Sequence, residues 1–294
     1  MYKIRSFFNI DILHKKGILG DGVTVAVLDS GAYPHTDFKN RIIEFRDYIN
    51  HRPEPYDDHS HGTHICGIIC GGGKNNKRYT GMAPGSEIIP VKVLDNTGHG
   101  DSDIIIPAIN WILSNRKIYN IRIVNISIGT KSSDCSEENS DLVRAVDTMW
   151  DEGIIVLVSA GNNGPDYRSI TIPGISRKVI TVGSCGWNNS SSTSSSRFSG
   201  KGPTHCNIPK PDIVVPGDNI ISCSTNDGYT AKSGTSMSTP VVSGAAALIL
   251  SRYPEITNSE FKKLLLKSAS DIGLDRYTQG HGMLNLQKLF AIIN

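Results

Sequence analysis

Short apolar runs alternate with helical patterns along the 294-residue chain, and this alternation constrains its fold most strongly. The apolar runs are rich in β-branched residues, as is typical of strands buried on both faces. We predict strands over Gly22–Leu28, Ile88–Leu94, Ile121–Ile128, Ile154–Val158, Val179–Val182 and Ile213–Val215. We predict helices over Ile104–Ser114, Leu142–Asp151, Met237–Arg252 and Glu260–Ser268. This order predicts an α/β fold with a mostly parallel central sheet and helices on both faces.

Length and composition bound the domain organisation. A chain of 294 residues is near the upper limit for one hydrophobic core, and 38% hydrophobic residues suffice to build that core. No internal repeat or linker is visible, so we predict a single domain over residues 1–294, with residues 1–20 as a lead-in. The serine-rich segment Asn188–Ser196 is predicted to be a solvated surface loop.

Charge and hydropathy exclude two classes of partner. Thirty Lys and Arg residues against 28 Asp and Glu residues give a net charge of +2, too balanced for a nucleic-acid or polybasic membrane surface. No apolar run reaches the roughly 18 residues of a membrane span. The apolar stretch around Phe7 is interrupted by Asn9 and Asp11, and no signal-peptide cleavage site follows. We expect a cytoplasmic protein or, if Met1 was added to a mature domain, a secreted one.

The cysteines show no short-spaced disulfide pattern. In a chain of this size we expect reduced thiols rather than covalent cross-links. Cys66 and Cys70 lie four residues apart on a predicted helix, where zinc binding is conceivable but lacks a second cysteine pair. We expect them to be small buried side chains. The six cysteines are Cys66, Cys70, Cys135, Cys185, Cys206 and Cys223.

Three polar residues stand where an open parallel sheet places its reactive groups, at strand carboxyl ends and helix amino ends. Asp29 ends the first strand, His61 opens a helical segment, and Ser236 follows a glycine turn at the start of a long helix. A helix amino end favours the neutral form of His61, which a general base requires. A helix amino end also directs backbone N–H groups at the oxyanion that forms when Ser236 attacks a carbonyl group.

Each of these residues alone has a structural explanation. Asp29 could cap a turn, and a serine at the position of Ser236 is usually a helix N-cap. An aspartate, a histidine and a serine in three such places together indicate nucleophilic catalysis.

At these residues the chain resembles the subtilisin-like serine proteases, or subtilases. The resemblance covers Gly20 to the C-terminus and includes the family's order of Asp, His, Asn and Ser. It implies Ser236 as nucleophile, His61 as general base, Asp29 as its orienting partner and Asn162 as an oxyanion-hole donor. The supporting motifs are Val27–Gly31, His61–His64, Ser159–Gly164, Gly234–Met237, Ala83–Pro84 and Lys210–Ile213.

The resemblance also implies how a protein or peptide substrate would bind. It would add as a strand between two backbone edges, where glycines allow close approach of another main chain. Thr171 aligns with the floor of the primary specificity pocket. The two edges are Gly98, His99 and Gly100, and Ser127, Ile128 and Gly129. A proteinaceous inhibitor is a further possible partner.

The lead-in of the chain departs from secreted subtilases, which carry a long inhibitory pro-domain. Only 28 residues precede Asp29, too few for such a domain. We therefore expect either a mature fragment or a chain that folds unaided, as intracellular members do. The compact loops and the Lys210–Ile213 motif resemble those of bacterial intracellular or minor members.

Competing functions fit less well. His59, His61 and His64 nearly match a metallo-hydrolase motif, but Thr63 stands where that motif needs an aspartate, so we expect His59 and His64 to be structural. Gly71–Lys74 resembles a phosphate loop without its Ser or Thr. A catalytically inactive scaffold is disfavoured because all four catalytic residues are present.

The last prediction concerns calcium, which some subtilases bind in the loop after the catalytic-histidine helix, together with a nearby aspartate. Here that loop, Gly71–Arg78, offers Asn75 and Asn76 among three cations, with Asp37 as the candidate aspartate. Calcium takes about 6–8 oxygen ligands and gains affinity from their negative charge. We predict no calcium ion at this loop, a solvated turn for Asp37, and no cofactor for catalysis.

Overall fold

The computed structural model describes residues 1–187 and 197–293. The predicted serine-rich loop therefore lies outside the described residues. The chain forms two compact units. Unit 1 contains residues 1–126, 220–231 and 243–255, and unit 2 contains residues 127–219, 232–242 and 256–294.

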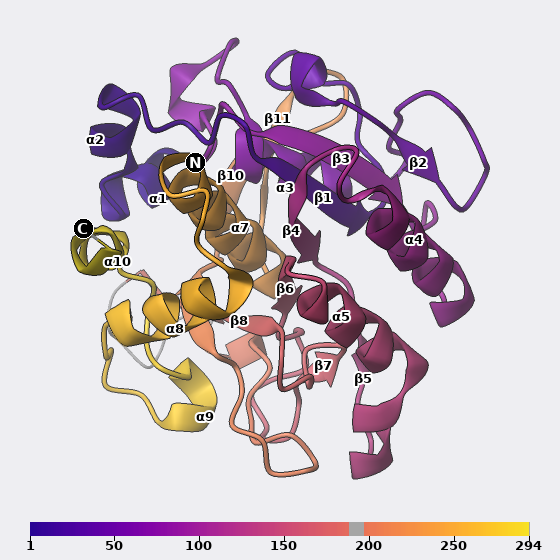
Figure 1. Ribbon diagram of the computed structural model, residues 1–294, viewed down its shortest axis with the longest axis vertical. Coiled ribbons are helices and arrows are strands. Elements are labelled where there is room, and N and C mark those ends of the chain that lie inside the picture. The colour runs from indigo at the N-terminus through magenta and orange to yellow at the C-terminus, as the bar shows by residue number, and fades with distance from the viewer. Residues whose placement is uncertain (188–196, 294) are drawn as a thin grey trace. The chain divides into compact units, whose positions relative to one another are not determined.

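Unit 1 is built on a parallel sheet with strand order β2-β3-β1-β4 (Figure 1). All six residues of β1 are buried, as expected for a strand covered on both faces. The strands are β1 Thr24–Asp29, β2 Arg46–Asp47, β3 Glu87–Lys92 and β4 Ile121–Ile126.

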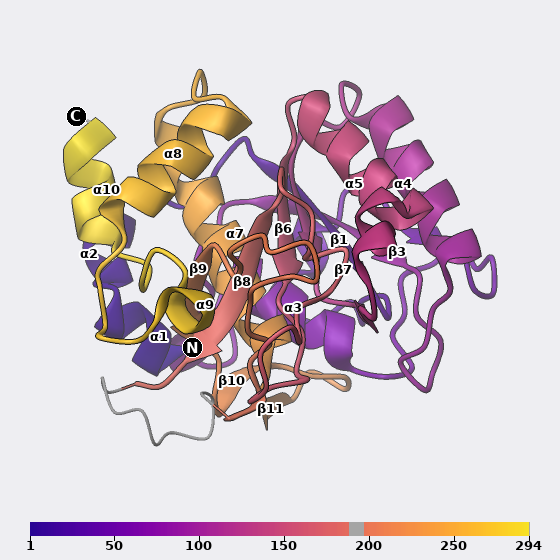
Figure 2. The ribbon, with the colours of Figure 1, turned by 90° about the horizontal axis from the view of Figure 1, so that it is seen from below.

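Two helices of unit 1 cover this sheet. Helix α4 lies on one side of its strands and α3 on the other (Figure 2), and both pack against β1. Helix α3 also packs against β10 of a two-stranded sheet, β10-β11. The helices are α1 Tyr2–Phe7, α2 Ile10–Lys15, η1 Lys39–Arg41, α3 His61–Cys70, η2 Lys77–Tyr79 and α4 Ser102–Asn115, and the strands are β10 Ile220–Cys223 and β11 Tyr229–Lys232.

Unit 2 has a second group of parallel strands, in the order β6-β8-β9, and an antiparallel pair, β5-β7. Helix α5 packs on β6, and α9 packs on β8. The strands are β5 Thr130–Lys131, β6 Ile155–Ser159, β7 Thr171–Ile172, β8 Ile180–Cys185 and β9 Ile213–Pro216. The helices are η3 Cys135–Asn139, α5 Asp141–Asp151, α8 Asn258–Ser268, α9 Arg276–Gln279 and α10 Leu286–Ile293.

Helix α7, Thr235–Arg252, begins in unit 2 and ends in unit 1. Most of its residues are buried, and small residues such as Gly244 and Ala245 allow close packing; a Cβ at Gly244 would collide with Met82. Pro240, the sixth residue of the helix, lacks the N–H that would bond the Ser236 carbonyl oxygen, and this oxygen instead accepts from Ser127 Oγ at 3.4 Å.

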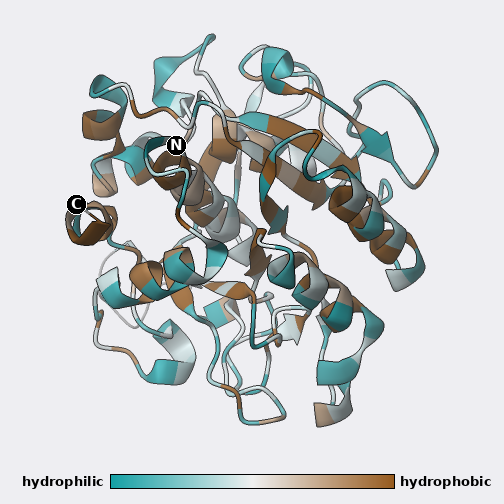
Figure 3. Ribbon diagram, viewed as in Figure 1, coloured by the Kyte–Doolittle hydropathy of each residue, from teal (hydrophilic) through white to brown (hydrophobic). Residues whose placement is uncertain are grey.

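The predicted elements are present. All six predicted strands and all four predicted helices occur, with ends shifted by a few residues. Figure 3 shows apolar residues concentrated on the strands and polar residues on the loops. Among residues 1–187 and 197–293, no helix has both the length and the apolar character needed to cross a bilayer.

The prediction of six reduced thiols is wrong for two of them. Cys135 and Cys206 form a disulfide between segments 71 residues apart in the sequence. The other four cysteines are free and buried, and burial raises the pKa of each, that of Cys185 to about 12. Such thiols stay protonated and are poor nucleophiles. Cys66 and Cys70 belong to no candidate metal-binding group within the described part of the chain.

The amino-terminal helix is fastened to the loop after α3 by Arg5. This guanidinium is 8% exposed and bonds Asp11 at 2.9 Å. Its Nη1 donates to the carbonyl oxygens of Lys77 and Thr80 at 3.0 and 2.8 Å. A positive charge therefore lies beside two backbone oxygens of this loop, one of which, Lys77 O, also accepts from the Thr80 hydroxyl at 2.9 Å.

Candidate active site

Asp29 and His61 form a tight pair in unit 1. Asp29 is the last residue of β1 and is fully buried, while the His61 side chain, at the start of α3, is 18% exposed. Nδ1 of His61 lies 2.8 and 2.9 Å from the two carboxylate oxygens of Asp29. A carboxylate only accepts, so Nδ1 carries the proton, and the basic lone pair is on Nε2. This is the tautomer that a general base needs.

Backbone and side-chain bonds hold the turn that follows Asp29. The N–H of Ser30 donates to Asp29 Oδ1 at 2.7 Å, and Ser30 Oγ accepts from the N–H of Gly62 at 2.9 Å. The turn after the strand is thus joined directly to the first turn of the helix that carries His61.

Asp57 organises the start of α3, and the sequence analysis missed it. Its carboxylate accepts from Ser30 Oγ at 2.9 Å, from the N–H of Ser60 at 2.8 Å and from the N–H and hydroxyl of Thr63 at 2.9 and 2.6 Å. An acidic side chain at this helix start satisfies N–H groups that have no partner within the helix. Local capping rules gave no signal for it, because the N-cap position is Ser60 and Asp57 lies three residues before that position.

Ser236 lies in the first turn of α7, in unit 2. Gly234 has φ +150°, a conformation that favours glycine, and it makes the turn into the helix. Ser236 Oγ donates to the carbonyl oxygen of Ser127 at 3.1 Å. The N–H of Ser236 belongs to the helix start, where the dipole favours negative charge.

Asn162 is oriented by the residue before Ser236. Its Oδ1 accepts from the N–H of Thr235 at 3.0 Å and from the hydroxyl of Thr235 at 3.1 Å. With its oxygen used in this way, the amide presents Nδ2 as a donor. The structure therefore places Asp29 beside His61 in unit 1, and Asn162 beside the residue that precedes Ser236 in unit 2.

The first predicted substrate edge lies in unit 1. Gly98 has φ +83°, and the carbonyl of His99 accepts from the N–H of Asp95 at 2.8 Å. A Cβ at Gly98 would come within 3.1 Å of His59 Nε2. His59 lies beside the catalytic pair, its ring centroid 6.0 Å from that of His61.

The second predicted edge lies in unit 2, beside Thr171. Thr171 is buried and pairs with Lys131 between the short strands β7 and β5. A Cβ at Gly129 would lie 2.6 Å from the Thr171 hydroxyl, and a Cβ at Gly161 2.7 Å from it. Thr171 thus touches both the end of the Ser127–Gly129 edge and the residue before Asn162.

The histidines of the His59–His64 segment have structural surroundings. His64 is buried, with Nε2 3.0 Å from the Ile220 carbonyl oxygen and 3.1 Å from that of Thr230. His59, His61 and His64 do not converge as a candidate metal-binding group within residues 1–187 and 197–293. The metallo-hydrolase alternative is therefore not favoured.

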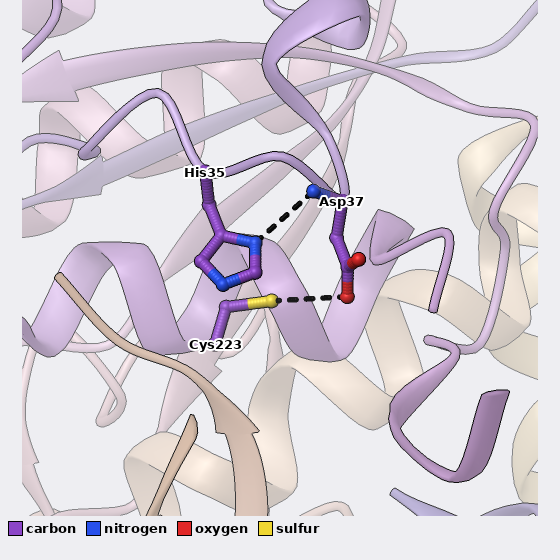
Figure 4. Close-up of side chains that lie close together, drawn as sticks. All are labelled: His35, Asp37 and Cys223. Carbon is purple, nitrogen blue, oxygen red and sulfur yellow. Dashed lines mark hydrogen bonds between the residues drawn. The ribbon is translucent and has the colours of Figure 1, made fainter. Parts of the chain in front are cut away.

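The prediction for Asp37 is wrong, because this side chain is only 3% exposed. Its carboxylate accepts from the N–H of Lys74 at 2.7 Å, from the Tyr229 hydroxyl at 2.9 Å and from the Cys223 thiol at 3.7 Å. It lies beside His35 (Figure 4), whose Nδ1 accepts from the Asp37 N–H and whose Nε2 bonds Gly228 O.

His35, Asp37 and Cys223 are close enough to hold a metal ion. Both ring nitrogens of His35 are nevertheless engaged with the backbone, and burial raises the pKa of the Cys223 thiol well above its usual range. We therefore interpret this cluster as a hydrogen-bonded part of the core.

Comparison with known families is decisive. The pattern of the family described as "Subtilase family" matches residues 20–285. The chain belongs to the subtilase family. The match includes both Asp29 and Ser236, so it spans the pairs described in both units.

Individual relatives agree. The chain is 42% identical over 280 residues to serine protease AprX of Bacillus subtilis, covering 86% of this chain and 62% of that protein. It is 36% identical to subtilisin of Bacillus pumilus, covering 94% of this chain and 93% of that one. Among solved structures, S41 psychrophilic protease matches with a TM-score of 0.80 and 30% identity, and sphericase with 0.78 and 27%. Each covers 90% of this chain and 92% of the other. These findings confirm the subtilisin-like α/β fold.

Proposed function

We propose that this protein is a serine endopeptidase that hydrolyses peptide bonds through an acyl-enzyme. The observation that carries the proposal is the buried Asp29 carboxylate holding Nδ1 of His61, in a chain that belongs to the subtilase family. The Asn162–Thr235 bonds beside Ser236 supply the second half of the machinery.

In the proposed reaction, Ser236 Oγ attacks the substrate carbonyl carbon while Nε2 of His61 takes its proton. The hydroxyl leaves its bond to Ser127 O as it does so. The oxyanion accepts hydrogen bonds from Nδ2 of Asn162 and the N–H of Ser236. His61 then protonates the amine, the C–N bond breaks, and water hydrolyses the ester by the same steps in reverse.

The proposed substrate is a protein or peptide chain bound as an added strand. Gly98–Gly100 and Ser127–Gly129 would provide the main-chain edges, since glycine allows a second backbone to approach closely. Thr171, in contact with Gly129, would form the floor of the pocket for the side chain before the cleaved bond.

Substitution of the two unit 2 residues separates their roles. Ser236→Ala should remove almost all turnover, because no nucleophile remains. Asn162→Ala should lower kcat by roughly 10²–10³, the established cost of this change in subtilisin itself, with KM little changed. Steady-state kinetics on a peptide substrate measure both, and an Asn162→Ala enzyme as fast as the parent would contradict the oxyanion assignment.

Thr171 should make the pocket selective for side chains of medium size. Because a branched side chain at the floor shortens the pocket, Leu or Met should be preferred over Trp before the cleaved bond. One or two carbon atoms discriminate by only ~1–3 kcal/mol, so the preference should be partial. Cleavage of a peptide library measures it, and Thr171→Gly should admit larger aromatic residues. A parent profile led by Trp, Lys or Asp would contradict this assignment.

We also propose that Arg5 replaces a calcium ion at the Gly71–Arg78 loop. Calcium would need several free oxygens there, but the carbonyls of Lys77 and Thr80 already accept from Arg5. The Asn76 side chain accepts from the N–H of Arg78, and Asp37 is engaged with Lys74 and Tyr229. The residues present therefore do not fit the ion.

Unfolding experiments on the Ser236→Ala protein test this, since they avoid autolysis. Arg5→Met should lower the free energy of unfolding by about 2 kcal/mol, because the charge-assisted hydrogen bonds of a buried guanidinium are lost. Arg78→Met, which removes the same charge from the exposed side of the loop, should cost less than about 0.5 kcal/mol. EDTA should leave the melting temperature unchanged. A fall of several degrees, reversed by calcium but not magnesium and located at this loop by hydrogen exchange, would contradict the proposal.

A further inference from the structure

We propose that Lys92 is a positioning residue for the Asp29–His61 pair, and this inference rests on the function proposed above. Lys92 ends β3 and is fully buried. It pairs with Asp29 in the register of the parallel strands β1 and β3. A lysine is almost never fully buried without partners, so the position requires an explanation.

Every donor of the Lys92 ammonium is used. Nζ donates to Ser30 O at 2.8 Å, to Leu94 O at 2.8 Å and to Asp58 Oδ1 at 2.7 Å. Three protons and three acceptors leave no donor for the Asp29 carboxylate itself. Lys92 therefore acts on the Asp29 carboxylate through its neighbours.

Those neighbours belong to the turn after Asp29 and to the segment before His61, whose relative positions set the geometry of the pair. Ser30 follows Asp29 and donates its N–H to that carboxylate at 2.7 Å. Asp58 lies in the segment that leads into α3, three residues before His61. One ammonium thus joins the turn after the acid to the approach to the base.

The ammonium also places a positive charge in a water-excluded region near the pair. A buried charge is poorly screened, so it opposes the addition of a second positive charge on the His61 ring. The other charged or titratable groups around His61 are Asp29 on β1 and Asp57, Asp58 and His59 before α3. The Asp58 side chain is 36% exposed, so its opposing charge is better screened than that of Lys92.

The two partners should therefore shift the titration of His61 in opposite directions. In Lys92→Met a positive charge is lost, the imidazolium becomes easier to form, and the midpoint moves to higher pH by roughly 0.5–1 unit. In Asp58→Asn a negative charge is lost, and the midpoint moves to lower pH by a smaller amount. Lys92→Arg keeps the charge and should stay close to the parent.

Nuclear magnetic resonance of the Ser236→Ala protein, labelled with ¹⁵N-histidine, measures this midpoint without any activity. The His61 signal is assigned by its loss in His61→Gln. Lys16→Met, an exposed lysine of unit 1, is the matched control and should not move the midpoint. In the active enzyme the acid limb of kcat/KM should shift in the same directions, whereas mere misfolding would lower kcat/KM without shifting the limb.

The proposal is overturned if the midpoint in folded Lys92→Met stays within about 0.2 unit of the parent, or if Lys92→Arg shifts it equally. If Lys92→Met does not fold, the titration midpoints of His61 in Asp58→Asn and Lys92→Arg test the proposal instead. A midpoint in Asp58→Asn that rises or stays unchanged overturns it. Absence of peptide hydrolysis in the parent, with the opposite shifts observed, would instead refute the proposed function and retain the Lys92 coupling.

Discussion

The bonds between the buried Asp29 carboxylate and Nδ1 of His61 are the interaction on which the site depends. Burying a carboxylate is costly unless hydrogen bonds and nearby charges compensate. Unit 1 provides that compensation with the N–H of Ser30, the imidazole itself and the ammonium of Lys92 behind the turn. The strand end, the helix start and a neighbouring strand all contribute to one hydrogen-bonded pair.

In unit 2, backbone and side-chain hydrogen bonds likewise orient the groups around Ser236. The start of α7 offers N–H groups and a favourable dipole, and Asn162 is held by Thr235 so that its amide hydrogen atoms are presented. The Ser236 hydroxyl donates a hydrogen bond to the Ser127 carbonyl oxygen. In the proposed chemistry, the groups that move protons and stabilise charge belong to the chain.

Much of the fold and part of the site could be predicted, because both follow local rules. Buried strands have apolar runs, and reactive residues follow strand ends and precede helices, which identified Asp29, His61 and Ser236. Asn162 and Thr171 needed the family resemblance, since an Asn beside glycine and a Thr two residues before proline have no local signature. In the structure, Asn162 bonds Thr235, and Thr171 lies close to Gly129 and Gly161.

What the sequence could not reveal depends on contacts between distant segments. The Cys135–Cys206 disulfide joins two cysteines that are 71 residues apart in the sequence, and no short-spaced cysteine motif indicates it. Asp37 was misjudged because its partner Tyr229 lies 192 residues away, so a carboxylate in a polar turn appeared solvated. Lys92 is a charged residue in an apolar strand, and only the fold brings Ser30 and Asp58 to it.

The central claim is that Ser236 is a nucleophile activated by the Asp29–His61 pair, and covalent labelling tests it most directly. The protein is treated with a serine-directed phosphonate and digested, and the modified peptide is mapped by mass spectrometry. The account predicts one adduct on Ser236, formed equally with EDTA present and lost or greatly slowed in His61→Ala and Asp29→Ala. An adduct elsewhere, or none while peptide hydrolysis continues and is stopped by a chelator, would contradict it.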